Sequence, residues 1–113
     1  MEFDKAELLK AEIDKRKFRR ARLITQVKCE ASGREAVAVS RDISAGGMFL
    51  NDPEPFPKNS VVSLAFRLNP TDPVMSCQGE VVYSIKGVGM GVMFTQISPE
   101  VRQALESFVN ESN

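Results

Sequence analysis

The chain has 113 residues, of which 42% are hydrophobic and 27% are charged, as is typical of one globular domain. Fifteen Lys and Arg residues balance fifteen Asp and Glu residues, so no overall field attracts the whole molecule to polyanions. The sequence contains no histidine, the most frequent general base and metal ligand. We therefore expect no enzyme activity, no metal and no cofactor.

An amphipathic helix is predicted over residues 3–16. Its apolar residues recur at the spacing of one helical face, namely Phe3, Ala6, Leu9 and Ile13. This apolar stripe would pack on the domain itself, on a second copy of the chain or on a partner protein. The N-terminus lacks the apolar core of a signal peptide, and no run approaches the ~20 apolar residues of a membrane span. We expect a cytoplasmic location and no membrane insertion.

From Leu23 onward, short runs rich in Val, Ile and Phe are bounded by Gly, Pro, Asn and Asp, which is typical of strands. The predicted strands are Arg22–Cys29, Ala36–Arg41, Gly47–Leu50, Val61–Leu68, Val74–Ser84 and Gly89–Thr95. Hairpin turns are predicted at Ser32-Gly33 and Lys86-Gly87. Many short strands without intervening helices predict a mainly β fold, and we expect a six-stranded antiparallel barrel.

A short helix is predicted over residues 99–110, where it would cover one end of the barrel. Ser98 is suited to the N-cap and Pro99 to the first helical position. The two cysteines, Cys29 and Cys77, lie in predicted strands without CxxC spacing, so we expect reduced, buried thiols.

The segment KRKFRRAR, residues 15–22, carries six basic side chains and no acid. Arg16 and Arg20 stand four apart, which places two guanidinium groups on the same side of a helix or tight turn. The planar guanidinium forms bidentate hydrogen bonds with phosphate and with the O6/N7 edge of guanine. A solvated helix end is an equally good interpretation of this run.

A second polar segment, RDISAGG at residues 41–47, lies between two predicted strands. The carboxylate of Asp42 can accept hydrogen bonds from guanine, and the Ser44 hydroxyl can donate one. Gly46 and Gly47 either leave room for a ligand or permit a positive φ. Taken alone, these residues are also those of an ordinary turn.

Together, RKFRR and DISAGG resemble the two-part RxxxR and DxSxxG signature of PilZ domains, bacterial receptors for cyclic di-GMP. The segments GEVVYS and GMGVMF are similar to later strands of that family. The resemblance implies a six-stranded antiparallel barrel. It divides the chain into an N-terminal helical extension, residues 1–14, and a PilZ-like domain, residues 15–113, which includes the helix at 99–110.

The resemblance also implies the ligand and the residues that bind it. The implied ligand-binding residues are Arg16, Arg20, Asp42, Ser44 and Gly47, with Lys15 and Gly46 as further candidates. Arg16 and Arg20 would bind phosphates and guanine Hoogsteen edges, and Asp42 would recognise guanine. The expected ligand is cyclic di-GMP, bound without chemical change.

We expect a ligand-driven switch. The arm that carries Arg16 and Arg20 would stay off the barrel until two phosphates neutralise it, and a partner protein would recognise the change. The sequence is compatible with a homodimer as well as with a monomer. The alternatives are a barrel that binds single-stranded nucleic acid and a protein-interaction module that binds no dinucleotide. A nucleic-acid polymer is not the expected partner, because the net charge is zero and the chain has no Trp and one Tyr.

Overall fold

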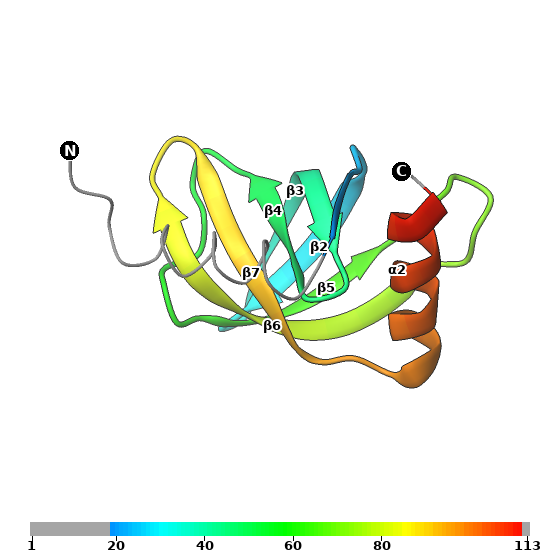
Figure 1. The fold of residues 1–113 in the computed structure, drawn as a ribbon. Helices are drawn as coiled ribbons and strands as arrows, with labels where there is room; N and C mark the ends of the chain where they lie inside the picture. Colours follow the sequence, from blue (N-terminus) through cyan, green and yellow to red (C-terminus); the bar gives the residue numbers. More distant parts are fainter. Residues whose placement is uncertain (1–18, 112–113) are drawn as a thin grey trace.

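The computed structural model describes residues 19–111 as one antiparallel sheet and a helix (Figure 1). The elements are β1 (Arg20–Arg22), β2 (Gln26–Ala31), β3 (Arg34–Ser44), β4 (Gly47–Asn51), β5 (Val61–Phe66), β6 (Met75–Ile85), β7 (Gly89–Gln96) and α2 (Pro99–Glu111). The predicted helix at residues 3–16 and the proposed extension, residues 1–14, lie outside the described part of the chain.

Strands β2 to β7 close into a barrel. The strand order is β1-β3-β2-β5-β6-β7-β4, and the additional pairing of β3 with β4 joins the two ends. All neighbouring strands are antiparallel. The predicted six-stranded antiparallel barrel is confirmed, and β1 is an extra strand beside β3.

Alternation of inward and outward residues explains why these segments form a barrel. In β2, for example, every second side chain is buried and the others are exposed. The inward side chains form one apolar core, which includes Val27, Cys29, Ile43, Met48, Leu50, Phe56, Val62, Leu64, Phe66, Val81, Met90 and Val92. Helix α2 adds Leu105 to this core, so it covers one end of the barrel as predicted (Figure 1).

The predicted turns and the helix start are confirmed. Ser32 and Gly33 both have positive φ, +53° and +78°, as a two-residue hairpin turn with right-handed strand twist requires. Gly87 has φ +81° in the β6–β7 hairpin. The Ser98 hydroxyl accepts a hydrogen bond from the Val101 amide at 3.2 Å and so caps α2.

The first predicted strand, Arg22–Cys29, is in fact two strands, because β1 and β2 are separated at residues 23–25. Both pair with β3, so they follow one another along the same edge. The Ser40 hydroxyl of β3 bridges the interruption, since it accepts from the Thr25 amide at 3.0 Å and donates to the Leu23 carbonyl at 2.5 Å. This side chain adds to two backbone hydrogen bonds across the interruption, from the Leu23 amide to the Arg41 carbonyl at 3.3 Å and from the Ser40 amide to the Thr25 carbonyl at 2.9 Å.

Within residues 19–111, no helix has both the length and the apolar character that crossing a membrane would demand.

We predict that Ser40→Ala destabilises the protein by about 1–3 kcal/mol, because it removes the hydroxyl partner of the buried Leu23 carbonyl and of the partly buried Thr25 amide. Urea unfolding measures the change. Ser63→Ala, at an exposed position of β5, is the control and should shift stability by less than about 0.5 kcal/mol. Equal effects of the two variants would contradict this role of Ser40.

Both cysteines are free and buried, as predicted. Burial raises the pKa of each thiol from its ordinary 9.0 to about 11, and for Cys29 the charge of Asp52 adds to the rise. The folded thiols therefore stay protonated at a pH where unfolded thiols ionise. Their contribution to stability is fully present below pH 9.0 and is lost as the pH rises towards about 11.

This linkage predicts that the free energy of unfolding decreases between pH 9.0 and about pH 11. Urea titrations at these two pH values measure the decrease. A Cys29→Ala/Cys77→Ala variant should show a shallower decrease. An identical pH profile for the variant would show that other groups cause the decrease.

Candidate functional site

A β-bulge in β3 shapes the segment that carries the second polar motif. Ser40 pairs with Leu50 of β4 and Asp42 pairs with Phe49, so Arg41 is one extra residue in β3. Because of the bulge, Arg41 and Asp42 both project from the outer face of the barrel, whereas Ser40 and Ile43 on either side are buried. Two charged side chains are thereby placed next to each other.

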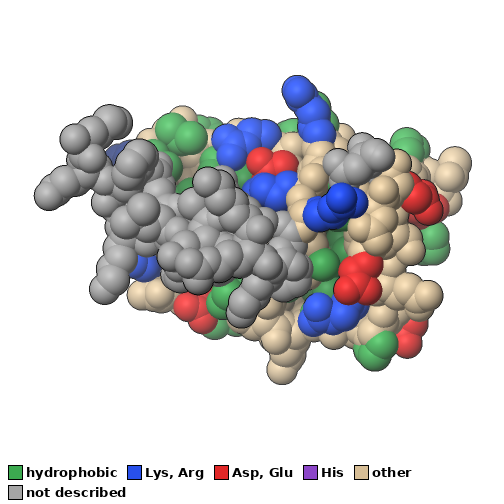
Figure 2. Space-filling model, in the orientation of Figure 1, with side chains coloured by type: hydrophobic (Ala, Val, Ile, Leu, Met, Phe, Trp, Pro, Cys, Tyr) green, Lys and Arg blue, Asp and Glu red, His purple; other side chains and the backbone are tan. Residues whose placement is uncertain are grey.

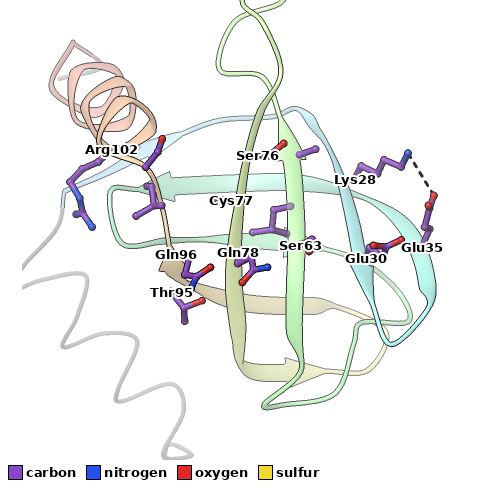
Figure 3. Close-up of a pocket in the computed structure, with 14 residues that line it drawn as sticks. Lys28, Glu30, Glu35, Ser63, Ser76, Cys77, Gln78, Thr95, Gln96 and Arg102 are labelled. Atoms are coloured by element: carbon purple, nitrogen blue, oxygen red, sulfur yellow. Dashed lines mark ion pairs between the residues drawn. The ribbon is translucent and has the colours of Figure 1, made fainter.

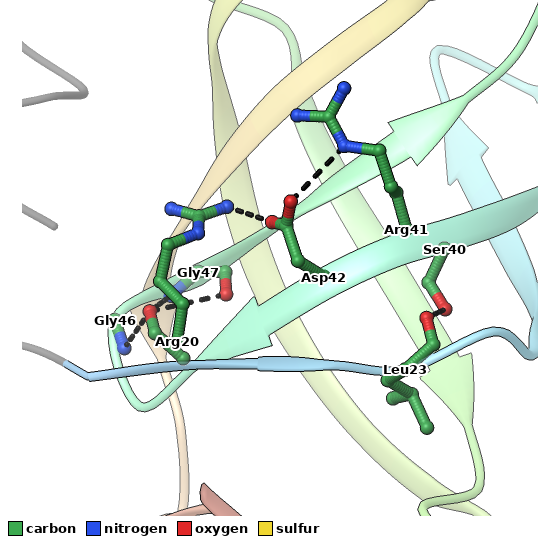
Figure 4. Close-up of polar contacts among 8 residues, drawn as sticks. Arg20, Leu23, Ser40, Arg41, Asp42, Gly46 and Gly47 are labelled. Carbon is green, nitrogen blue, oxygen red and sulfur yellow. Dashed lines mark hydrogen bonds and ion pairs between the residues drawn. The ribbon is translucent and has the colours of Figure 1, made fainter. Parts of the chain in front are cut away.

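The Asp42 carboxylate lies between two arginines, as Figure 4 shows. Arg20 of β1 donates from a terminal nitrogen to Oδ1, and Arg41 donates from Nε to Oδ2 at 3.1 Å. The Arg20 and Asp42 side chains are 25% and 20% exposed, so water still reaches the pair. The structure therefore brings together two predicted site residues that are 22 positions apart in the sequence.

The surroundings of Asp42 carry an excess of positive charge. Arg22 stands opposite Asp42 in the β1–β3 register, and Arg20 and Arg41 contact the carboxylate. Figure 2 shows basic side chains gathered around an acidic one over strands β3 and β4. Two guanidinium groups thus contact one carboxylate and a third arginine stands opposite it in the strand pairing, which favours an anionic ligand that also offers hydrogen-bond donors to Asp42.

The Ser44 hydroxyl is buried and holds the turn that follows β3. It accepts hydrogen bonds from the amides of Gly46 and Gly47 at 3.1 and 3.2 Å and donates to the Gly47 carbonyl at 3.4 Å. The Gly46 carbonyl in turn accepts from the Phe94 amide of β7 at 2.8 Å. These contacts fix the turn beside Asp42.

Gly47 is required by strand packing. Its φ is not positive, and a Cβ at this position would collide with the backbone carbonyl of Val92 in β7 and lie 3.2 Å from the Met93 Cα. Our two explanations for this glycine, a positive φ or room for a ligand, missed this contact. The close approach of β4 to β7 accounts for Gly47 without any ligand.

The structure describes only part of the predicted arm, since Lys15 and Arg16 lie outside the described residues. The expectation that the arm stays off the barrel is wrong for Arg20. Arg20 belongs to β1, pairs with Ser44 of β3 and contacts Asp42. These are contacts of the chain with itself, and the Asp42 charge neutralises Arg20 there. We call Arg20, Arg41, Asp42 and the turn 44–47 the Asp42 corner.

A shallow depression on the outside of β2, β5 and β6 is a weaker candidate site (Figure 3). Two basic side chains, Lys28 and Arg102, and two acidic ones, Glu30 and Glu35, line it, and Lys28 lies 3.7 Å from Glu35, so the charges balance. Such a surface has little attraction for phosphates. No group of His, Cys, Asp or Glu within residues 19–111 is arranged to hold a metal ion.

The role of Arg41 was not predicted from the sequence. Besides its bond to Asp42, its guanidinium lies over the Phe49 ring, 4.0 Å from the centroid. Stacking of this kind is worth roughly 0.5–1 kcal/mol at an exposed site. The only sequence signal was the position of Arg41 directly before the DxSxxG motif.

The sequence profile of the PilZ domain matches residues 14–111. The chain therefore belongs to the PilZ domain family, as its motifs suggested. No curated protein sequence matches the chain.

Three solved structures share the fold. The inhibitor of motility MotI/DgrA of Bacillus subtilis matches with a TM-score of 0.71 and 20% identity over 85% of this chain and 50% of its own. The PilZ domain of YcgR from Escherichia coli, solved with c-di-GMP, matches with a TM-score of 0.67 and 13% identity over 86% of this chain and 90% of its own.

The PlzA protein of Borreliella burgdorferi, solved in complex with c-di-GMP, matches with a TM-score of 0.62 and 13% identity over 92% of this chain and 46% of its own. The chain thus spans about half the length of the MotI/DgrA and PlzA chains. At these identities the likeness concerns the fold.

We predict that Gly47→Ala destabilises the protein by about 1–3 kcal/mol, because the added methyl group forces β4 away from β7. Thermal and urea unfolding measure the loss. Gly33→Asn is the control, since Gly33 has open space and Asn tolerates a positive φ, and it should change stability by less than about 0.5 kcal/mol. Wild-type stability of Gly47→Ala would contradict the packing role.

Proposed function

We propose that the protein is a receptor for cyclic di-GMP that binds the dinucleotide at the Asp42 corner. The observation that carries the proposal is the contact between Arg20 and Asp42, because it joins the RxxxR and DxSxxG motifs. Membership in the PilZ domain family supports it, and so do the two structural relatives solved with c-di-GMP.

The chemistry of the Asp42 corner suits this ligand. The Asp42 carboxylate can accept both donors on the Watson–Crick edge of guanine, N1–H and N2–H, once its arginine partners turn away. Arg20 can bind a phosphate or the guanine O6/N7 edge, and Arg16 would supply the second guanidinium of the motif. Ser44 and Gly47 would shape the turn beneath the ligand rather than read it.

Binding would exchange one set of ionic partners for another. Arg20 and Arg41 each occupy one oxygen of Asp42, so the dinucleotide would replace these bonds with bonds from guanine. The released arginines would then bind phosphate. The chain before Arg20, with Lys15 and Arg16, would close over the ligand, and a partner protein in the cytoplasm would recognise the new surface. The protein would release the dinucleotide unchanged.

We predict a dissociation constant for cyclic di-GMP in the micromolar range or tighter, measured by isothermal titration calorimetry. Arg20→Ala and Asp42→Ala should each weaken binding by about tenfold or more, since a bidentate contact to guanine is worth about 1–3 kcal/mol. Arg34→Ala is the matched control. It removes the same charge at the opposite end of β3 and should bind like wild type.

Two outcomes would overturn the proposed binding at the Asp42 corner. One is the absence of heat with cyclic di-GMP while a long single-stranded oligonucleotide binds with a steep salt dependence, which would favour the nucleic-acid alternative. The other is equal affinity in wild type and Asp42→Ala, which would move the site elsewhere. Linear or monomeric product after incubation would show that the protein is an enzyme.

A further inference from the structure

A mainly apolar groove lies on the outer face of the barrel and shares no residue with the Asp42 corner. Its volume is about 560 Å³. Three large apolar side chains that line it are strongly exposed, namely Ile24 at 64%, Val37 at 64% and Val74 at 51%. Two cations, Lys28 and Arg67, line it as well. We call the surface formed by these five residues the Ile24 groove.

Strand pairing places the Ile24 groove on β3, β2 and β5. Lys28 of β2 pairs with Val37 of β3 on one side and with Ala65 of β5 on the other. Every second residue of β2 points outward, and Lys28 is one of these. Ile24 lies between β1 and β2, and Val74 ends the connection from β5 to β6, which leaves the barrel at the end that carries α2 (Figure 1). The groove thus joins a strand surface to two connecting segments.

Strand propensity explains one of the three exposed apolar side chains. Valine is favoured on a strand surface, so the exposure of Val37 alone would need no further reason. Ile24 and Val74 lie outside the strands, where this preference does not apply. Single exposed apolar residues are ordinary, whereas several that gather in one concave site are typical of a binding surface.

The charge of the Ile24 groove is positive. No Asp or Glu among residues 19–111 lines it. Arg67 donates from Nε to the Asp72 carbonyl at 3.0 Å, and none of the ion pairs within residues 19–111 involves it. Lys28 lies 3.7 Å from Glu35, but both side chains are exposed, so this contact is weak. Both cations can therefore accept an acidic partner.

We propose that the Ile24 groove binds a segment of a partner protein in which apolar side chains are flanked by Asp or Glu. The apolar side chains would cover Ile24, Val37 and Val74, and the carboxylates would pair with Lys28 and Arg67 at the rim. This site is additional to the proposed dinucleotide site and does not depend on it.

A different protein fits the groove better than a second copy or a membrane. A two-fold axis through the groove would bring Lys28 and Arg67 close to the same cations of the other copy, and like charges repel. Recognition of an anionic membrane typically uses clusters of about 4–8 basic residues. The Ile24 groove has two, and its apolar side chains line a hollow that a flat bilayer does not fill.

The test selects peptides from a random phage-displayed library on the immobilised full-length protein, without dinucleotide. We expect the enriched peptides to be richer than the starting library both in Leu, Ile, Val and Phe and in Asp and Glu. A fluorescein-labelled copy of the most enriched peptide then gives a dissociation constant by fluorescence anisotropy.

Three variants locate the binding site of this peptide. Val37→Asp should weaken binding by about tenfold or more, because it places a carboxylate on the apolar surface. The double variant Lys28→Glu/Arg67→Glu should weaken it by about fivefold or more at low salt. Val61→Asp is the matched control, since Val61 is 62% exposed on β5 outside the groove, and it should bind like wild type. A thermal unfolding transition near that of wild type verifies that each variant is folded.

Several results would contradict the proposal. These are a selection that enriches no peptide, enriched peptides without an excess of acidic residues, and equal affinity in Val37→Asp and Val61→Asp. Sedimentation that shows a wild-type dimer dissociated by Val37→Asp would assign the groove to a second copy. Binding to phosphatidylglycerol vesicles that Val37→Asp abolishes would assign it to a membrane.

These measurements need no dinucleotide, so their failure is distinguishable from failure of the proposed receptor function. A protein that binds the selected peptide and not cyclic di-GMP would retain the Ile24 groove as an interaction site, and the converse result would leave the receptor without it.

Discussion

The Asp42 carboxylate is the group on which the arrangement of the site depends. It forms ion pairs with Arg20 of β1 and with Arg41 of β3, the strand that also carries Asp42. It lies next to the β-bulge in β3. A single acid among several arginines leaves the site net positive while each cation keeps a defined direction. The site is thus ordered by ionic contacts, which the proposed ligand, with its guanine donors and phosphates, would have to replace.

The barrel was predictable because its strands follow simple local rules. Outward and inward residues alternate, and positive φ falls at Ser32, Gly33 and Gly87 in the hairpins. The division of the first strand was not predictable, because it occurs where the Ser40 hydroxyl, from a neighbouring strand 15 residues away from Thr25, bonds to the backbone of Leu23 and Thr25. Sequence patterns indicate the alternation of residues within a strand and the positions of turns. A hydrogen bond from a side chain to a neighbouring strand depends on the register between the two strands.

The same difference applies to the site. The contact of Arg20 with Asp42 agrees with the two motifs found in the sequence, and Ser44 lies beside them with its hydroxyl turned to the backbone of the turn. Arg41 was missed because its outward position depends on a bulge, which is a property of strand pairing. The stacked rings of Phe49 and Tyr83 left a faint sequence signal, namely the small residues Gly89 and Gly91 in an otherwise apolar strand.

The short strand β1 sets a limit on the size of a ligand that the proposed mechanism could enclose. Backbone pairing with Ser44 of β3 holds Arg20 in place. Under the proposed function, Arg16, four residues earlier, would reach no further than about 14 Å from Arg20. That reach would suit a compact ring of two nucleotides better than a long strand.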